Sequence, residues 1–424
     1  MTLLSFAKPL IIYTSTSRPT VELTVKTVAG GSGRASLPLG YDDPSRHNGK
    51  QPIHQLVLKA IESLIPVLLG AKFAHHSAFD QLITEATEGL EDGLRANVQY
   101  LVSAACAQAC SADLGIPLHK YLAEMAGFDA YRGLPVPMIT LICGGKVATT
   151  PFGVQAIMVV PTGVSPFPEA VRAGSEISHA LAQIFKREGK AYAIGDEGGF
   201  STSFDGNGTR EVLCCALNTA IQAIDEAGYS KPAGRIQIAI DFAAEHCKDA
   251  DGRYSLVNQK DTLSVQEVLD LHQFIVDRYP VLLLEDPVAT SNLDALGELH
   301  KRLERKSLIA ADDLLDSVSG VAVGEPWDAV VAMPDRLGTL SDTLQFVSAA
   351  QAAGYVPIAS HRSGETKDVL LSDLAAALSL PFIKAGGMSG SERTGKWNEL
   401  LRISELYDAN RPVLQGCLEG NGKV

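Results

Sequence analysis

The chain has 424 residues, 46% of them hydrophobic, and a formal net charge of -13 at pH 7. This length and hydrophobic content allow one large core together with a smaller domain. The acidic balance argues against nucleic acid or an anionic membrane as the main partner, because both require a basic surface. Met1–Ile11 lacks a basic leader with a small-residue cleavage site, and no uninterrupted apolar run is long enough to span a membrane. We therefore expect a cytoplasmic protein.

The seven cysteines are odd in number, and none forms a C-x-x-C pair. This spacing disfavours a zinc site or a disulfide framework and favours reduced, mostly buried thiols. Cys106 and Cys110 lie four residues apart in an alanine-rich run, so they share one face of a helix and suit close helix packing.

The first third of the chain predicts an α+β domain. Residues 21–25 alternate between apolar and polar side chains, as a half-buried strand does. The glycine-rich segment 30–33 turns this strand back through residues 34–37 and so predicts a hairpin. From Gln51 onward the apolar residues take helical spacing, and a second long helical stretch covers roughly 94–126.

Residues 134–137 have the sequence Leu-Pro-Val-Pro and are predicted to form a stiff linker, because two prolines disfavour a helix and fix an extended path. We therefore predict an N-terminal domain of residues 1–133 and a second domain of residues 134–424. Beyond the linker, short apolar runs alternate with helical stretches, as consecutive strand–helix units do.

Several of these apolar runs end in a charged or polar residue. A buried strand has no reason to end in this way repeatedly unless the strand ends converge on a polar ligand. In a (β/α)-barrel the chemistry lies at the carboxyl ends of the parallel strands, so the pattern predicts a barrel with its active site there. The runs and the residues that follow them are Ile236–Ile240 and Asp241, Val281–Leu284 and Glu285, Leu308–Ala311 and Asp312, Val356–Ala359 and Ser360-His361, and Phe382-Ile383 and Lys384. One run differs, because Ala329–Ala332 ends in Met333.

Asp241, Glu285 and Asp312 follow three successive strands and can meet within a short distance. Oxygen-only ligands suit a hard cation such as Mg²⁺, which keeps positions open for substrate oxygens. The alternative is that each acid caps a following helix or pairs with a nearby arginine. Three acids in register at consecutive strand ends favour the metal site.

Arg362 and Ser363 are expected to open a helix directly after a strand. A guanidinium, a hydroxyl and free backbone N–H groups at a helix start form a phosphate or carboxylate site, and Lys384 supplies a second positive group. Alternatively, Arg362 only pairs with Glu365, and Lys384 only extends its ammonium group to solvent.

Gly195–Phe200 places an acid pair between glycines. The glycines let the backbone approach a ligand closely and leave Glu197 accessible to it. The alternative is a tight turn with solvated acids.

These motifs resemble the enolase family, in the same order along nearly the whole chain. They are Arg18–Glu22, Gly195–Phe200, Ile240–Glu245, Leu284–Pro287, Ala311–Leu314, Ser360–Thr366, Ile383-Lys384 and Ser391–Ile403. The resemblance implies an α+β N-terminal domain followed by a modified (β/α)8 TIM-type barrel, the enolase fold. It also implies Mg²⁺ as the cofactor, a small phosphorylated three-carbon acid as the ligand, and a homodimer.

The resemblance also implies roles for the site residues. In the family, the acids that match Asp241, Glu285 and Asp312 hold the first Mg²⁺. The residues that match His361, Arg362, Ser363 and Lys384 meet the substrate's phosphate and carboxylate, and the acid that matches Glu197 acts on the leaving hydroxide. The resemblance therefore assigns Glu197, His361 and Lys384 to catalysis.

The residues that remove the substrate's α-proton in the family are changed. The family uses a lysine at the end of the strand that matches Val330–Met333, and a thioether such as that of Met333 has no usable basicity. The family's loop histidine falls on Val147, and the glutamate of its Gln-Glu-Phe segment falls on Ala156. Its serine ligand for a second Mg²⁺ falls on Asp42, a carboxylate that can either hold this metal or form a turn.

Three functions are compatible with this pattern. We favour an enzyme with altered chemistry on a phosphoenolpyruvate-like or phosphoglycerate-like ligand, similar to the carboxyphosphonoenolpyruvate synthases of phosphinate antibiotic pathways, in which Lys146 meets an extra carboxylate. The second function is an ordinary phosphopyruvate hydratase with Glu197 or Lys146 as the replacement base. The third is a non-catalytic enolase-like protein that binds metal and phosphate or a protein partner. Retention of all the binding side chains disfavours the third.

Overall fold

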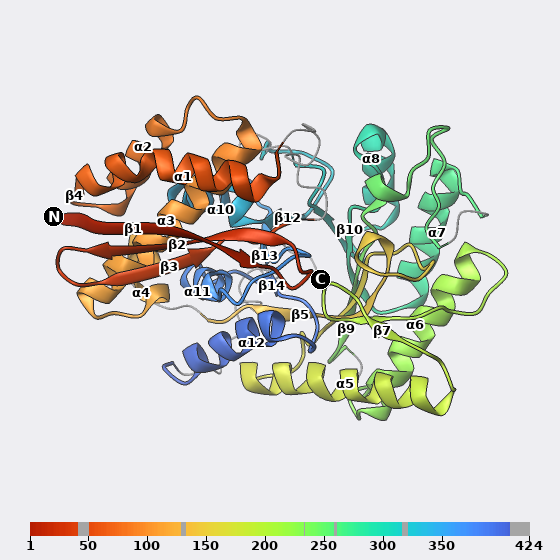
Figure 1. Cartoon of the computed structure of the whole chain (residues 1–424). Helices are drawn as coiled ribbons and strands as arrows, with labels where there is room; N and C mark the ends of the chain where they lie inside the picture. The colour runs from red at the N-terminus through yellow and green to blue at the C-terminus, as the bar shows by residue number, and fades with distance from the viewer. Residues whose placement is uncertain (41–50, 129–132, 233, 258–260, 316–320, 408–424) are drawn as a thin grey trace.

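The computed structural model of the chain describes residues 1–40, 51–128, 133–232, 234–257, 261–315 and 321–407. An N-terminal sheet with its helices lies on one side of the molecule and a closed barrel on the other (Figure 1). The predicted fold class, an α+β region followed by a modified barrel, is confirmed.

The N-terminal sheet is antiparallel in the order β3-β2-β1-β4. Its strands are β1 (Thr2–Tyr13), β2 (Pro19–Thr27), β3 (Ser32–Ser36) and β4 (Lys72–Phe73). The predicted hairpin is confirmed, because β2 pairs with β3 across the glycine-rich turn. Strand β1 was not predicted. Leu4 is its only buried residue, so its sequence lacks an alternating pattern.

In the described part of this region the sheet is joined by four helices, namely α1 (Ile53–Gly70), α2 (His76–Ala86), α3 (Asp92–Leu114) and α4 (Leu118–Met125). The prediction of one helical stretch over 94–126 is wrong. The chain bends by 108° between α3 and α4, where Gly115 takes a positive φ and Pro117 precedes the new helix. Strand β3 lies so close to α3 that a Cβ at Gly33 would come within 2.0 Å of the Ala105 carbonyl oxygen.

Helix α1 is long and apolar enough to cross a membrane by length and composition, and so is the bent pair α3–α4 taken together. The apolar stripe of α1 faces the protein core beside the sheet. The buried residues of that stripe are Ile53, Val57, Ala60, Ile61, Leu64 and Leu68. They follow helical spacing, which is typical of an amphipathic helix packed on a core.

Eight strands close the barrel in the order β14-β13-β12-β11-β10-β9-β6-β5, with β14 pairing back to β5. They are β5 (Val136–Cys143), β6 (Ala156–Val160), β9 (Gln237–Asp241), β10 (Val281–Glu285), β11 (Leu308–Ala311), β12 (Ala329–Ala332), β13 (Val356–Ser360) and β14 (Phe382–Lys384). Strand β6 runs antiparallel to both β5 and β9, whereas the other neighbours in the barrel are parallel. The barrel is therefore modified from the regular βα repeat.

The predicted linker 134–137 is wrong in its second half, because Val136 and Pro137 begin β5, and Pro137 is paired with Ile383 of β14. Proline fixes an extended backbone, and a strand shares that conformation with a linker. The division of the chain at residue 133 stays a prediction.

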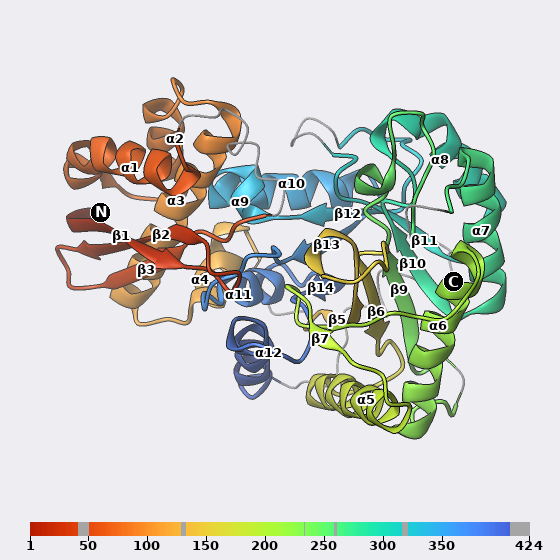
Figure 2. The ribbon, with the colours of Figure 1, turned by 45° about the vertical axis from the view of Figure 1, so that its right-hand side comes forward.

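Helices surround the barrel, as Figure 2 shows for α5 to α8. They are α5 (Phe167–Arg187), α6 (Thr209–Glu226), α7 (Val265–Arg278), α8 (Leu293–Arg302), α9 (Pro334–Leu337), α10 (Leu340–Ala352), α11 (Leu370–Ala377) and α12 (Ser391–Ser404). A hairpin of β7 (Ala193–Ile194) and β8 (Phe200–Ser201) extends from β5. Apolar side chains such as Met138, Leu283 and Phe382 fill the barrel interior, so polar groups can gather only at the strand ends.

Candidate active site

The charged strand ends meet as the sequence predicts. Asp241 and Glu285 lie opposite each other at the ends of β9 and β10, and Lys384 ends β14. A cavity of about 1110 Å³ lies at these ends. The predicted residues that line it are Glu197, Asp241, Asp312, His361, Arg362, Ser363 and Lys384. Glu285 is fully buried and contacts Lys384.

Lys384 is an internal cation that bridges two of the predicted metal ligands. Its Nζ lies 2.5 and 2.6 Å from the Glu285 carboxylate oxygens and 3.2 Å from Asp241 Oδ2. The alternative in which Lys384 extends to solvent is therefore wrong, because the side chain is buried within the barrel end. Burial lowers the pKa of Lys384, but the neighbouring carboxylates outweigh this effect and raise the pKa well above its ordinary value.

Negative charge exceeds positive charge around these acids. Burial and the nearby Asp241 carboxylate raise the pKa of Glu285 well above its ordinary value. Asp286, which accepts hydrogen bonds from the backbone N–H groups of Asp312 and Asp313, has its pKa raised by burial and by both of those carboxylates. Burial and Asp312 likewise raise the pKa of Asp313 to about 7. These acids repel one another more than Lys384 alone compensates.

This donor set fits a divalent cation. Asp241, Glu285 and Asp312 offer only oxygen ligands, which suit a hard ion. Burial first, and then repulsion between the carboxylates, raises the pKa values of Glu285 and Asp286, and added positive charge would relieve the repulsion. Arg336 partly neutralises the group, because its Nη1 lies 3.1 Å from Asp312 Oδ1. The alternative, in which each acid pairs with a nearby arginine, holds only for Asp312, which pairs with Arg336.

The segment that carries Arg362 and Ser363 is a loop, and the prediction that these residues open a helix is wrong. The next helix, α11, begins only at Leu370. The Glu365 side chain accepts a hydrogen bond from the Arg362 backbone N–H and thereby closes a local turn that replaces the first turn of a helix. The Arg362 guanidinium instead pairs with Asp335 at 2.6 Å.

Ser363 presents a buried hydroxyl to the cavity, and among the described residues its Oγ has no hydrogen-bond partner. Buried hydroxyls are normally satisfied, so this one is suited to a ligand oxygen. Arg362 and Ser363 together therefore retain the chemistry of an anion site, although a loop and not a helix start positions them.

Glu197 and His361 face each other across the cavity, with 4.0 Å between Glu197 Oε2 and His361 Nε2. Glu197 lies in the turn between β7 and β8 and is only 6% exposed, but it lines the cavity and is accessible there, as the sequence predicts. The alternative of solvated acids holds only for its neighbour Asp196, which is exposed. Gln155 lies between Glu197 and Asp241, with its Nε2 3.4 and 3.3 Å from the two carboxylates.

The pKa of Glu197 is raised to about 7, first because the side chain is buried and also because Asp241 is near, while Lys384 opposes the shift. A carboxyl group with this pKa can hold or release a proton near neutral pH, as a general acid or base must. His361 is the opposite case, since burial and Arg393 lower its pKa well below the ordinary value and keep its ring neutral.

We expect a carboxyl group in the metal-free protein to titrate with a midpoint near pH 7. The infrared difference spectrum between wild type and an E197Q variant would report this group. Because the folded pKa exceeds the ordinary 4.5, protonated Glu197 stabilises the fold, and this contribution disappears as pH rises toward 7. A midpoint near pH 4.5 would contradict the burial argument, and the exposed Glu226 on α6 provides an E226Q control.

Met333 lines the cavity directly after β12, at the strand end where the family carries its base. Among the described residues that line this cavity, Lys384 is the only lysine. Val147 also lines it, and Ala156 is fully buried opposite Asp241 in the pairing of β6 with β9. These three positions thus present apolar side chains where the resemblance places the family's proton-transfer groups.

One predicted residue, Lys146, remains apart from this group. Lys146 is exposed and does not line the cavity, although its Nζ lies 3.0 Å from Nδ1 of His246, which does line it. Asp42 lies outside the described residues. The roles of both stay predictions.

Sequence reasoning missed several site residues, chiefly Asp335 and Arg336. They directly follow Met333-Pro334 and pair with Arg362 and Asp312, respectively. The signal was present, because both are charged residues inside the segment that departs from the enolase pattern. Their partners could not be predicted, because the pairing depends on the three-dimensional arrangement of neighbouring strand ends.

A closed barrel with metal-type carboxylates at its carboxyl end defines an enzyme-like class of TIM-barrel protein. Residues 131–415, about two thirds of the 424-residue chain, match the family described as Enolase, C-terminal TIM barrel domain. The chain therefore belongs to the enolase family. Members of this family are generally enzymes and typically depend on Mg²⁺.

Proposed function

We propose that this protein is a Mg²⁺-dependent enolase-family enzyme whose chemistry differs from phosphoenolpyruvate hydration. The favoured reaction is that of a carboxyphosphonoenolpyruvate synthase in phosphonate or phosphinate antibiotic biosynthesis. The observation that carries the proposal is Met333, an apolar side chain at the base position of a cavity whose anion-binding and metal-type groups are otherwise present.

The bond changes of such a reaction explain why no carbon base is needed. The hydroxyl of a three-carbon enol acid gives its proton to Glu197, and its oxygen forms a bond to the phosphorus of an activated phosphonoformyl group. The bond between that phosphorus and its leaving group breaks, and the leaving group keeps the electron pair. No C–H bond is cleaved, so the loss of an amine at Met333 is tolerated. Arg362, Ser363 and Lys384 bind the anionic groups, and Glu197 moves a proton at an oxygen.

Mg²⁺ held by Asp241, Glu285 and Asp312 would supply charge neutralisation for these anions. A second ion at Asp42 belongs to the same proposal. Lys146 would meet the extra carboxylate of the phosphonoformyl group, since it lies beside the cavity-lining His246.

Ordinary phosphopyruvate hydratase activity is the second candidate. It is supported by Glu197, whose pKa of about 7 suits proton transfer. It is weakened by Lys384, which is engaged by Glu285 and Asp241, and by Lys146, which is exposed. A non-catalytic binding protein would use the acids and the Ser363 hydroxyl for its metal and anion, but it would have no need for a cavity carboxyl group with a pKa near 7, as Glu197 has.

With purified protein and Mg²⁺, we expect hydration of phosphoenolpyruvate to be about 10²–10⁴-fold slower than with an ordinary enolase assayed alongside, because a general base contributes roughly this factor. Loss of the enol absorbance measures the rate. Phosphonoformate should bind in calorimetry with Mg²⁺ but not with a chelator. R362M should abolish that binding, whereas R187M, at an exposed ion pair on α5, should not. A hydration rate equal to that of the ordinary enolase would overturn the proposal.

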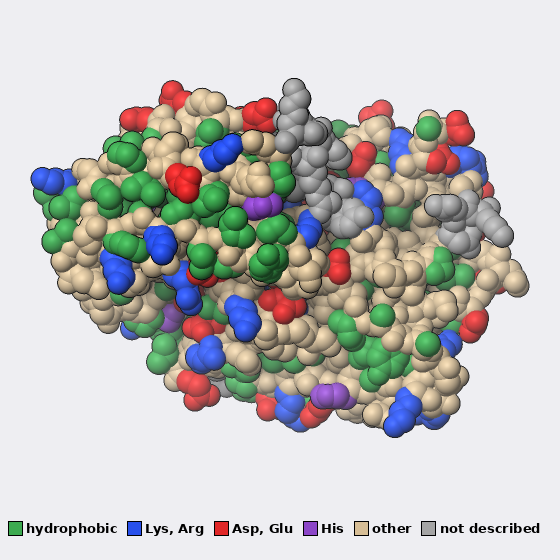
Figure 3. Space-filling model, viewed as in Figure 1, with side chains coloured by type: hydrophobic (Ala, Val, Ile, Leu, Met, Phe, Trp, Pro, Cys, Tyr) green, Lys and Arg blue, Asp and Glu red, His purple; other side chains and the backbone are tan. Residues whose placement is uncertain are grey.

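The partner we propose is a small phosphorylated or phosphonylated carboxylate, with no nucleic acid and no membrane, in the cytoplasm. We also propose a homodimer. Hydrophobic side chains gather over the N-terminal sheet in Figure 3. The exposed members on β1 are Phe6, Leu10, Ile11 and Tyr13, and such a patch favours contact with a second copy.

A further inference from the structure

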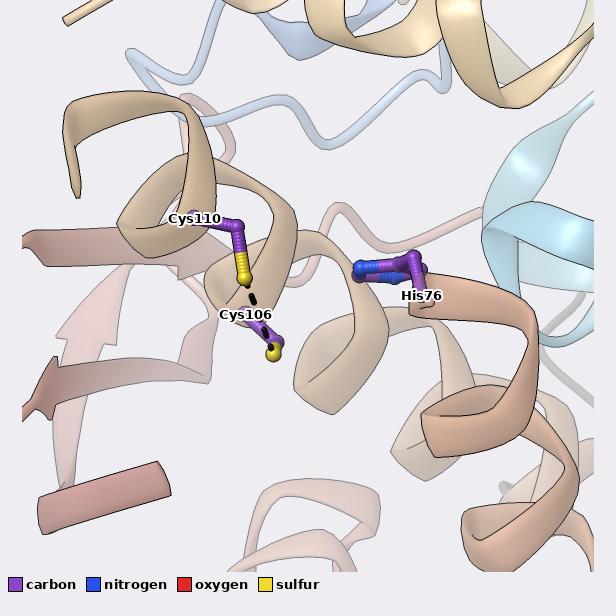
Figure 4. A group of neighbouring side chains, drawn as sticks. All are labelled: His76, Cys106 and Cys110. Carbon is purple, nitrogen blue, oxygen red and sulfur yellow. Dashed lines mark hydrogen bonds between the residues drawn. The ribbon is translucent and has the colours of Figure 1, made fainter. Parts of the chain in front are cut away.

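Two cysteines and a histidine form a buried group in the N-terminal region, far in sequence from the barrel residues. Cys106 and Cys110 lie one turn apart on α3, and His76 begins the neighbouring helix α2 (Figure 4). A nitrogen and both sulfurs lie within 4.8 Å of one another. All three residues are at most 4% exposed.

The spacing of these atoms matches the coordination sphere of zinc. Zn–S bonds of about 2.3 Å in a tetrahedral site place two sulfurs about 3.8 Å apart. The Cys106 and Cys110 sulfurs are 4.0 Å apart and point toward each other, and the nitrogen-bearing edge of the His76 ring faces them (Figure 4). Thiolate and imidazole ligands suit zinc, whereas the oxygen-only acids at the barrel end suit a harder ion.

Neighbouring side chains orient the imidazole as metal-bound histidines usually require. His76 Nε2 lies 3.1 Å from Ser103 Oγ and 3.3 Å from Asp80 Oδ1. Asp80 is itself fixed, because its Oδ2 accepts a hydrogen bond from the Ser341 backbone N–H. A carboxylate behind the ring sets the tautomer and leaves Nδ1 as the ligand nitrogen.

Tyr121 of α4 occupies the remaining side of the group. Its hydroxyl is 3.3 Å from His76 Nδ1 and also hydrogen-bonds to Cys110. The Tyr121 oxygen thus lies beside both a nitrogen and a sulfur of the group.

We propose that Cys106, Cys110 and His76 bind a structural Zn²⁺ ion, with the Tyr121 hydroxyl at the fourth position. Two thiolates cancel the charge of the ion, so the loaded group is electrically neutral and can stay buried. The ion joins α2, α3 and α4 to one another and has no part in the chemistry at the barrel end. Its ligands come from separate helices, so the site forms as the chain folds.

Metal analysis of the purified full-length protein tests this site. In buffer with excess Mg²⁺, we expect about one Zn²⁺ per chain after gel filtration. A C106S/C110S variant should lose this ion, and a matched C214S/C215S variant, altered on α6, should keep it. Reconstitution with Co²⁺ should give a thiolate-to-cobalt charge-transfer band, which carboxylate ligands at the barrel end cannot produce.

Absence of both the Zn²⁺ and the cobalt–thiolate band from wild-type protein would overturn the proposal, and so would a Cys106–Cys110 disulfide found by mass spectrometry. Zn²⁺ that persists in a folded C106S/C110S variant would also overturn it. If that variant does not fold, the cobalt band of the wild-type protein still decides, because it needs no substitution.

Discussion

A K384M variant is expected to unfold with a free energy ~3–5 kcal/mol lower than wild type in metal-free buffer at mildly alkaline pH. The reason is that the ammonium group of Lys384 is the buried partner of both Glu285 and Asp241. Its removal leaves two buried carboxylates without this counter-charge. Urea denaturation followed by circular dichroism measures the loss.

Mg²⁺ should restore part of the lost stability in K384M, because the ion supplies positive charge to the same acids. The matched control is K396M. Lys396 is equally buried, but it pairs with Glu365 at 2.7 Å, away from the predicted metal ligands. K396M should be destabilised to a similar degree with or without Mg²⁺. An identical response of the two variants to Mg²⁺ would mean that the acids at the barrel end do not hold the ion.

An M333K variant is expected to hydrate phosphoenolpyruvate at least about 10²-fold faster than wild type, the lower end of what a positioned general base contributes. The new amine would enter the cavity at the end of β12, where the reacting carbon of a ligand held by Arg362 and Lys384 would lie. Adding V147H and A156E should increase the rate further, since these substitutions restore the remaining groups of the family pattern. The enol absorbance assay measures each rate.

The control for this restoration is L337K, which places an amine on the same cavity wall from α9. It should leave the hydration rate at the wild-type level, because the amine is offset from the strand end. Equal gains in M333K and L337K would show that any nearby amine suffices. No gain in M333K, or in the triple variant, would mean that the cavity has diverged beyond the base itself.

The strand ends could be predicted from the sequence because each of these strands is an apolar run that ends at a charged residue. Asp241, Glu285, Asp312 and Lys384 each follow an apolar run that the structure confirms as a barrel strand. Neighbouring parallel strands bring such ends together without further information. Arg362 and Ser363 of the predicted anion site also line the cavity, although a loop and not a helix start carries them.

The pairing of side chains could not be predicted in the same way. Arg362 faces Asp335, 27 residues earlier, and Lys384 faces Glu285, 99 residues earlier. Sequence patterns limited to one segment do not contain such contacts. The same limit explains why the group of Cys106, Cys110 and His76 was not predicted. His76 lies on another helix, 30 residues before Cys106, and the spacing of the cysteines gives no sign of it. The sequence also could not distinguish a linker from a strand at Val136-Pro137, because both have an extended backbone.

Arg393 of α12 holds two segments of the site together. Its buried guanidinium donates to the backbone oxygens of Asp196, Arg362 and Ser363 and contacts Nδ1 of His361. One side chain thus ties the Glu197 turn to the loop after β13, although it does not line the cavity. A survey of substitutions across this chain would record Arg393 as indispensable to turnover, yet its contribution would be architectural. A change of chemistry at Met333 therefore leaves intact the contacts by which Arg393 positions the Glu197 turn and the loop after β13.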